Sequence, residues 1–557
     1  MPTVTFPLSY LQRLTHRSLA DLEALAFNYG LEVTWRDQAL EVDVTAERPD
    51  LLAAEGFIRA MNIYGGQPRL VPDALTNSGY RVTVEPAVLG LRPYLAALVV
   101  RQANLQVEGL DLLIQFQEKV TQTFGRQRKK IAIGVYDLDR ITGDLTYTAR
   151  PAADLQFVPL GATTPITAAA LLAHHPAGKM YGATLPSPDV VPVLQDSQGK
   201  ILSVPPIING SGVGEISAET RHLFIDVTGI VPQTVQETAN ILAHNFLDTG
   251  AEVQTVTVIT PEGSHLTPSL ARRVVPFSAR CLNEIMGSAI PKANLGQVLA
   301  RMDLMVSGTH EVYVPTYRTD ILSQVDIAGD LMVALGLDQI QAEPLSVKVH
   351  LGQADDQRQF VLRVGDLSQR LGLMEVKGHV LTDPALVEGF SAPYLQTSNA
   401  KSRTYSATRT TLQLGLIEVL SRNIQAPKPI NLYETGEVIR LTATGQGEEF
   451  QAWGFASLDA RASFSTAKAY VQTLLRALIL DYTLTAGNRP YYIPGRSAQV
   501  QVAGTVVGEF GEVHPRLLNQ FSFPEPIAMG EINLTQIYRL GQGSDLNGPK
   551  STPSGQI

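Results

Sequence analysis

Three aspartates fall close together in the segment VPTYRTDILSQVDIAGD, and carboxylates at this spacing are able to bind a cation. Asp326 and Asp330 are four residues apart, so on a helix they share one face, where two like charges cost about 0.2–0.5 kcal/mol. Asp320 precedes them in a predicted strand and turn, and the segment offers little positive charge nearby. Oxygen ligands of this kind suit Mg²⁺ or Ca²⁺ better than zinc. The alternative is structural, with Asp326 capping the helix while Asp320 and Asp330 face water.

A second group of polar residues lies in the segments ILSVPPIINGSG and LFIDVTG. The double proline forces an extended stretch and then a turn, which leaves the side chains of Asn209 and Ser211 and nearby backbone N–H groups free to bind a ligand. Asp226 and Thr228 lie two apart on a predicted strand, so their side chains point to the same face. Such a pair either lines a pocket or simply ends the strand before Gly229.

Several common active-site motifs are missing from the sequence. It contains no P-loop, no GxSxG and no HExxH, which removes the usual nucleotide-binding and hydrolase signatures. A single cysteine, Cys281, excludes an internal disulfide framework and a multi-cysteine zinc site. Neither a signal peptide nor an apolar run of roughly 18 residues is present, so we expect a cytoplasmic protein without a membrane span.

The formal net charge of −9 argues against a protein that coats nucleic acid over its whole surface. It leaves room for local basic patches, of which the clearest is RQRKK, residues 126–130, directly before the apolar run IAIGV. A patch at that position reads either as a solvated helix end or as a contact for a polyanion.

Helix signals mark the elements that must position these residues. Ser18, followed three residues later by Asp21, predicts a helix start, and Gly30 is placed to end that helix. Thr234 and Glu237 predict a capping box for a later helix. Near the C-terminus, two alternating runs predict a hairpin that turns at Ala503 and Gly504.

The chain of 557 residues is long enough for several domains, and the pattern of short strands and helices predicts an α+β class. The expected divisions are an N-terminal α+β domain, a second α+β domain, a smaller unit holding the aspartates, a larger α+β region and a polar, disordered tail. Their ranges are 1–85, 90–268, 270–345, 355–540 and 541–557.

Eight fragments together resemble the β subunit of phenylalanine–tRNA ligase in its archaeal and eukaryotic form. They are VTAERPDLLAAEG, KIAIGVYDLDRI, DSQGKILSVPPIIN, LFIDVTG, VPTYRTDI, RTTLQLGLIEVLSRN, YETGEVI and YYIPGRSAQVQVAGTVVGEFGEVHP. Each fragment is weak by itself, but all eight stand in the family's order and at about its spacing. The resemblance covers roughly residues 1 to 540.

This resemblance implies what each domain does. Residues 90–268 would be an editing, tRNA-binding domain, and residues 270–345 a winged-helix-like module. Residues 355–540 would form an antiparallel-sheet domain like a class II synthetase core but without its catalytic motifs. A partner α subunit would bind ATP and phenylalanine and charge tRNAPhe, in an assembly of two α and two β chains.

Carried over position by position, the family's editing pocket falls on Leu202, Ser211, Asp226 and Thr228, with Asn209 beside them. Leu202 would pack on the ring of a mischarged tyrosine, and Asp226 or Thr228 would meet its hydroxyl. No pair of nucleophile and base is evident, so the resemblance implies hydrolysis by a positioned water.

The family's Mg²⁺ positions fall on Asp320, Asp326, residue 329 and Asp330. Residue 329, usually acidic in the family, is Gly329 here, which removes one charge and one ligand. The family's histidine in the motif IGxHDLD is replaced by Tyr136. Two other functions therefore stay open: a free-standing aminoacyl-tRNA deacylase, and a divergent RNA-binding or assembly paralogue.

Overall fold

The computed structural model of this protein describes residues 2–69, 72, 74–287, 295–308, 310–340, 352–390 and 393–541. The chain divides into two compact units, Met1–Ser346 and Val347–Ile557. The tail predicted to be disordered lies outside the described residues, except for Gly541. None of the described helices combines the length and the apolar character that a membrane span needs.

The chain begins with a small α+β region whose helix signals were correctly predicted. Ser18 and Asp21 form a capping box at the start of α2, and Gly30 ends that helix with a φ of 91°. A three-stranded antiparallel sheet of order β1-β3-β2 packs beside the helices. The elements are β1 (Thr3–Pro7), α1 (Leu8–Leu14), α2 (Leu19–Tyr29), β2 (Glu32–Arg36), β3 (Ala39–Asp43), the 3₁₀ turn η1 (Pro49–Leu52) and α3 (Ala54–Tyr64).

A ten-stranded mixed sheet follows, and it carries the second group of polar residues. Its strand order is β12-β11-β10-β7-β4-β14-β5-β13-β6, with β15 paired to β14. The strands are β4 (Thr76–Val84), β5 (Tyr94–Arg101), β6 (Ile131–Asp137), β7 (Leu145–Pro151), β10 (Val190–Asp196), β11 (Ile201–Val204), β12 (Ile208–Asn209), β13 (Leu223–Gly229), β14 (Glu252–Thr260) and β15 (Gly263–Thr267). The sheet therefore includes β4, a strand that lies within the range 1–85 predicted for the N-terminal domain.

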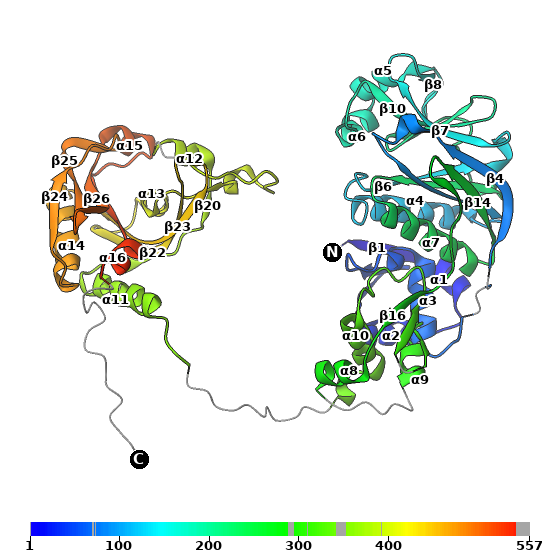
Figure 1. Cartoon of the computed structure of the whole chain (residues 1–557), viewed down its shortest axis with the longest axis horizontal. Coiled ribbons are helices and arrows are strands. Elements are labelled where there is room, and N and C mark those ends of the chain that lie inside the picture. The colour runs from blue at the N-terminus through cyan, green and yellow to red at the C-terminus, as the bar shows by residue number, and fades with distance from the viewer. Residues whose placement is uncertain are drawn as a thin grey trace. The chain divides into compact units, whose positions relative to one another are not determined.

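Helices α4 (Gln106–Gln122) and α7 (Pro232–Asp248) cover one face of this sheet, as Figure 1 shows. Two short strands, β8 (Gln156–Phe157) and β9 (Ile166–Thr167), and helices α5 (Ala168–His174) and α6 (Pro176–Tyr181) lie near β10.

The predicted capping box of α7 is wrong. Pro232 takes the first helical position, where its missing N–H costs nothing, so Thr234 already lies inside the helix. Glu237 instead accepts a hydrogen bond from Gln233.

The aspartate segment belongs to a small module, in which the described residues form three strands and three α-helices. Its sheet has the order β16-β18-β17, and α8 and α9 pack against α10. Its elements are β16 (Arg273–Pro276), α8 (Ala279–Met286), α9 (Leu295–Ala300), β17 (Met305–Ser307), β18 (Glu311–Val314) and α10 (Gln324–Leu335).

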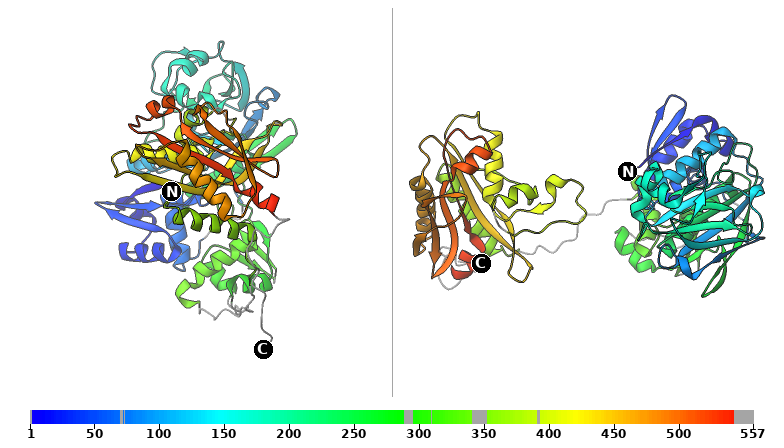
Figure 2. Two further views of the ribbon diagram at one scale, coloured as in Figure 1. Left: turned by 90° about the vertical axis from the view of Figure 1, so that its left-hand side faces the viewer. Right: turned by 90° about the horizontal axis from the view of Figure 1, so that it is seen from above.

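The second unit is built on a seven-stranded sheet of order β19-β22-β23-β27-β26-β25-β24, antiparallel except where β19 pairs with β22. Helices pack on both of its faces (Figure 2), because alternate residues of the long strands enter two separate hydrophobic clusters. The predicted hairpin turn at Ala503 and Gly504 is confirmed, and both residues have a positive φ.

The longer elements of this unit are α11 (Asp356–Arg370), α13 (Leu412–Arg422), β22 (Ile430–Leu441), β23 (Gly447–Leu458), α14 (Phe464–Ala477), β25 (Tyr492–Val502), β26 (Thr505–Val513) and β27 (Ile527–Asn533). The shorter ones are β19 (Met374–Glu375), β20 (Leu381–Thr382), α12 (Pro384–Glu388), β21 (Ala407–Thr408), β24 (Tyr482–Ala486), α15 (Pro515–Gln520) and α16 (Leu534–Gly541).

Candidate functional site

A cavity of about 110 Å³ lies on the large sheet, where β13 and β6 meet the turn that joins β11 to β12. Six polar or charged side chains line it: Arg128, Tyr136, Ser203, Asn209, Asp226 and Thr228. The remaining lining is apolar or glycine, so these few polar groups are well placed to set the orientation of a ligand.

Asp226 and Thr228 reach the cavity together because they alternate with Val227 along β13. Gly134 faces Asp226 across the pairing of β13 with β6. A Cβ at this glycine would collide with the hydroxyl of Tyr136 and with the carboxylate of Asp226. The glycine therefore provides the space in which these two side chains meet.

The carboxyl group of Asp226 is held by a tyrosine from the neighbouring strand. The Tyr136 hydroxyl donates a hydrogen bond to Asp226 Oδ1 at 2.6 Å, and it lies 2.8 Å from the hydroxyl of Ser203. Burial raises the pKa of Asp226 to about 7, although the hydrogen bond from Tyr136 and the charge of Arg92 oppose that rise. At neutral pH this carboxyl group is therefore poised between its two protonation states.

A buried arginine fixes the other polar group of β13. Arg92 donates from Nε to Thr228 Oγ1 at 3.1 Å and from Nη2 to the Thr228 carbonyl at 2.7 Å. Its burial lowers its own pKa to about 10, which leaves it cationic at neutral pH. Because Thr228 Oγ1 accepts from Arg92, its hydroxyl proton stays available to donate to a ligand.

The structure brings three of the five predicted pocket residues together. Asn209, Asp226 and Thr228 line the cavity, and the Asn209 amide also donates to the Val135 carbonyl at 3.3 Å. Leu202 instead lies fully buried in the hydrophobic cluster that contains Tyr136. Ser211 donates to Glu215 Oε1 at 2.6 Å and does not line the cavity.

Four residues in or beside the cavity were not predicted from the sequence as part of the site: Arg92, Arg128, Tyr136 and Ser203. Tyr136 was visible only as a departure from the family motif. Arg92 lies 136 residues before Thr228 in the sequence, and no local pattern connects the two.

The aspartate cluster contains its own cation, contrary to the expectation of little positive charge nearby. Arg318 donates from Nη2 to Asp320 Oδ2 and to Asp330 Oδ2, both at 2.7 Å, and from Nε to Asp320 Oδ1 at 2.9 Å. The Arg318 side chain is 1% exposed, and the two aspartates are 15% and 12% exposed. Neither aspartate simply faces water.

These two carboxyl groups respond differently to their burial. Burial raises the pKa of Asp330 despite the nearby charge of Arg318. The pKa of Asp320 is lowered, because attraction and hydrogen bonding from Arg318 outweigh its burial.

The third aspartate has a different partner. Asp326 Oδ2 accepts from the backbone N–H of Leu322 at 2.9 Å and of Ser323 at 2.8 Å, where Ser323 is the N-cap of α10. Gly329 contributes no side chain. In the described part of the chain, no group of three or more His, Cys, Asp or Glu side chains is arranged to hold a metal ion. The residues at the four predicted metal positions therefore do not fit a Mg²⁺ ion as a set.

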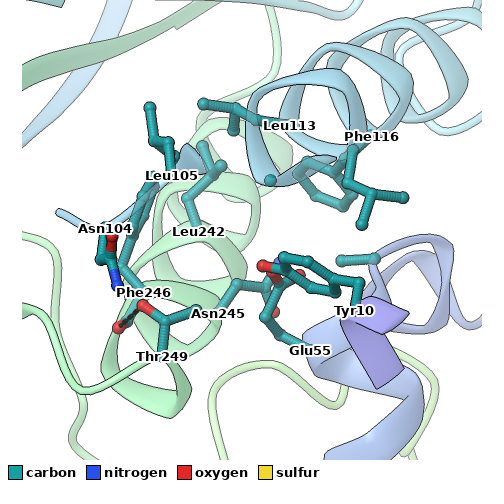
Figure 3. Close-up of a pocket in the computed structure, with 13 residues that line it drawn as sticks. Tyr10, Glu55, Asn104, Leu105, Leu113, Phe116, Leu242, Asn245, Phe246 and Thr249 are labelled. Atoms are coloured by element: carbon teal, nitrogen blue, oxygen red, sulfur yellow. Dashed lines mark hydrogen bonds between the residues drawn. The ribbon is translucent and has the colours of Figure 1, made fainter. Parts of the chain in front are cut away.

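A further cavity lies where α1 and α3 pack against α4 and α7 (Figure 3). The Glu55 carboxyl group accepts a hydrogen bond from the Tyr10 hydroxyl there, and burial raises the pKa of Glu55. The volume of this cavity is about 30 Å³, which accommodates one water molecule rather than a substrate.

Comparison with known proteins agrees with this organisation. Residues 275–337 match the family model of the tRNA synthetase B5 domain, and residues 340–534 match that of the phenylalanyl tRNA synthetase β chain CLM domain. The phenylalanine–tRNA ligase β subunit of Sulfurisphaera tokodaii is 31% identical, over 96% of this chain and 99% of that protein. The corresponding subunit of Pyrococcus furiosus is 30% identical, over 97% of this chain and 100% of that protein.

A solved structure extends the comparison to the first unit. The crystal structure of an N-terminal fragment of the phenylalanyl-tRNA synthetase β subunit from Pyrococcus horikoshii matches with a TM-score of 0.57 and 28% identity. The match covers 60% of this chain and 99% of that fragment. The sequence similarity extends over nearly the full length of the chain, and both domain models match. The chain therefore belongs to the family of phenylalanine–tRNA ligase β subunits, aminoacyl-tRNA synthetase components of protein biosynthesis.

Proposed function

We propose that this chain proofreads tRNAPhe by hydrolysing mischarged Tyr-tRNAPhe in the cavity where β13 and β6 meet the turn between β11 and β12. It would act in the cytoplasm, in an assembly with two α subunits and a second copy of itself. The α subunit would bind ATP and Mg²⁺ and carry out the ligation of phenylalanine. Residues 90–268 would then be the editing domain, and residues 355–540 a class II-like core without catalytic motifs.

One observation carries this proposal: the buried side chain of Asp226 is the one carboxyl group among the described residues that line this small cavity. Tyrosine and phenylalanine differ by one hydroxyl, which a synthetic pocket shaped for phenylalanine rejects only weakly. A second pocket reverses the preference when it contains a polar group that only the tyrosine hydroxyl can satisfy.

The size and polarity of the cavity support this use. An engineered protein cavity of about 150 Å³ binds benzene, so a cavity of about 110 Å³ with an open mouth is of the right order for one aromatic ring. Because Asp226 Oδ1 already accepts a hydrogen bond from Tyr136, we assign recognition of a tyrosine hydroxyl to Asp226 Oδ2 and to the hydroxyl proton of Thr228. Phenylalanine in this pocket would leave those groups unpaired, at a cost of about 1–3 kcal/mol.

Hydrolysis itself would use a water molecule positioned beside the ester. Within the described residues that line the cavity, no serine or cysteine nucleophile is paired with a histidine base. A covalent intermediate is therefore not part of the proposed mechanism. The ester lies at the opposite end of the amino acid from the tyrosine hydroxyl, so Asp226 contributes recognition and takes no part in proton transfer at the ester.

The test uses the chain co-expressed with the α subunit of the same organism. Asp226→Asn and Thr228→Val should each slow deacylation of Tyr-tRNAPhe by about 5- to 150-fold, the equivalent of 1–3 kcal/mol, while phenylalanine charging stays unchanged. Thr148→Val is the matched control, since Thr148 is a buried threonine of the same sheet outside the cavity. Undiminished deacylation in both cavity variants would refute the proposal.

A further inference from the structure

The turn between α4 and β6 has an unusual backbone. Arg126, Gln127 and Arg128 follow one another with φ values of 48°, 56° and 62°, a left-handed conformation that residues other than glycine rarely adopt. Such conformations persist only where the surrounding structure enforces them, and they concentrate at functional sites.

Hydrogen bonds from both ends of the turn hold this conformation. The N–H of Gln127 donates to the Gln122 carbonyl at 3.0 Å, and the N–H of Lys130 donates to the Gly125 carbonyl at 2.9 Å. Both bonds are local to the turn. The turn is therefore anchored to the end of α4 and to the start of β6.

Arg92 connects this turn to the floor of the cavity. Besides Thr228, its guanidinium donates to the carbonyls of Arg128 and Lys129 at 3.2 and 3.3 Å. Among the described residues, no ion pair to a carboxylate is formed by this arginine, which is 2% exposed. This buried cation binds only one hydroxyl group and backbone carbonyl groups. It thereby fixes the distance between the turn and Thr228.

The side chains of the turn divide into two sets. Arg128 turns toward the cavity, where it donates to the carbonyls of Pro206 and Ile207, both at 3.1 Å, and its guanidinium lies 4.1 Å from the centre of the Tyr181 ring. Arg126 and Lys129 are exposed, and neither has an ion-pair partner among the described residues. Two free cations therefore stand within three residues of a side chain that lines the cavity.

We infer that the turn Arg126–Lys130 binds the phosphodiester backbone of the RNA strand whose 3′ end enters the cavity. The inference rests on the proposed function, because an aminoacyl ester at the end of an RNA brings phosphates to the mouth of any pocket that receives it. The contrast with a net charge of −9 for the whole chain strengthens it. Lys and Arg supply the affinity for phosphates, so a local group of them is needed in a chain whose net charge is negative.

The experiment compares the co-expressed complex carrying Arg126→Gln and Lys129→Gln with a control carrying Lys401→Gln and Arg461→Gln. The control removes the same two charges from exposed positions of the second unit. Binding of a fluorescent single-stranded RNA with the acceptor-end sequence of tRNAPhe is followed by anisotropy across a range of salt concentrations. We expect the turn variant to bind at least about fivefold more weakly, with a salt slope smaller by about 1.4, and the control to match the wild type.

Kinetics separate this inference from the proposed function. In the turn variant, KM for deacylation of Tyr-tRNAPhe should rise about as much as RNA binding weakens, while kcat stays unchanged. Hydrolysis of the tyrosyl ester of adenosine, which has no phosphate, should stay at the wild-type rate. A wild-type complex that hydrolyses neither substrate, combined with weaker RNA binding in the turn variant, would refute editing and leave the RNA site intact.

Three results would overturn the inference. The first is equal RNA binding by the turn variant and the control. The second is displacement of the RNA from the wild type by millimolar inorganic phosphate alone, which would make the turn a site for free anions. The third is loss of the α subunit from the turn variant, which would make the turn a protein contact.

Discussion

Replacing Arg318 with methionine should destabilise the small module that contains the aspartate cluster. The substitution removes the hydrogen bonds to Asp320 and Asp330 and a bond of 3.0 Å from Nη1 to the Met302 carbonyl. It leaves the largely buried Asp330 without its ion-pair partner, and it leaves Asp320 with Arg48 alone, whose Nε lies 3.9 Å from Asp320 Oδ1. Removing one partner of a buried ion pair costs about 3–5 kcal/mol. Because the two aspartates keep 15% and 12% exposure, water can hydrate them in part, and we expect the lower end of that range.

Hydrogen exchange followed by mass spectrometry measures this locally in the full chain. A loss of about 3 kcal/mol corresponds to roughly 150-fold faster exchange in peptides that cover α10, while peptides from β22 in the second unit serve as an internal reference. Arg280→Met is the matched control, since the Arg280–Glu284 pair on α8 is exposed at 89% and 61% and exposed pairs contribute about 0–1 kcal/mol.

The same measurement tests whether a metal holds the cluster. With Arg318 as the counter-ion, a chelator or added Mg²⁺ should leave exchange in α10 of the wild type unchanged. The reasoning would be refuted if Arg318→Met exchanged as slowly as Arg280→Met, or if chelation alone removed protection from α10 in the wild type.

Two further predictions concern the cavity. Gly134→Ala should separate Tyr136 from Asp226, because the new Cβ collides with both, and should slow deacylation of Tyr-tRNAPhe while phenylalanine charging persists; normal editing in this variant would contradict the geometry. The folded-state pKa of Asp226 is about 7 against an ordinary value of 3.8, so the folded state binds the extra proton, and stability is lost as the pH rises from about 4 to 7, by on the order of 4 kcal/mol. Asp226→Asn should abolish that loss, and parallel curves of unfolding free energy against pH for the two proteins would count against it.

The local elements could be predicted from the sequence where side chains act on their immediate neighbours. Ser18 and Asp21 define the start of α2, and Ala503 and Gly504 define a tight turn, because each depends on residues within a few positions. The shared face of Asp226 and Thr228 follows from strand geometry alone. The capping box predicted at Thr234 was wrong because Pro232, two residues earlier, provides the stronger signal for the start of the helix.

The candidate sites were less predictable because they depend on contacts distant in sequence. Tyr136 meets Asp226 across 90 residues, and no periodicity indicates that two strands so far apart become neighbours. Arg318 lies two residues before Asp320 in the sequence, but this spacing does not show that its side chain binds the carboxylates of both Asp320 and Asp330. Leu202 came from the resemblance, and it alternates along β11 with Ser203, which lines the cavity, so the two side chains face opposite sides of the sheet. Ser211 was predicted from both the turn and the resemblance, but its hydroxyl binds Glu215.

The central claim is that the cavity prefers tyrosine over phenylalanine on the same tRNA. The most direct measurement is the ratio of deacylation rates for Tyr-tRNAPhe and Phe-tRNAPhe with the wild-type complex at subsaturating substrate. One unpaired buried polar group, at about 1–3 kcal/mol, predicts a ratio of about 5 to 150 in favour of tyrosine. Equal rates for the two substrates, or no hydrolysis of either, would contradict the account.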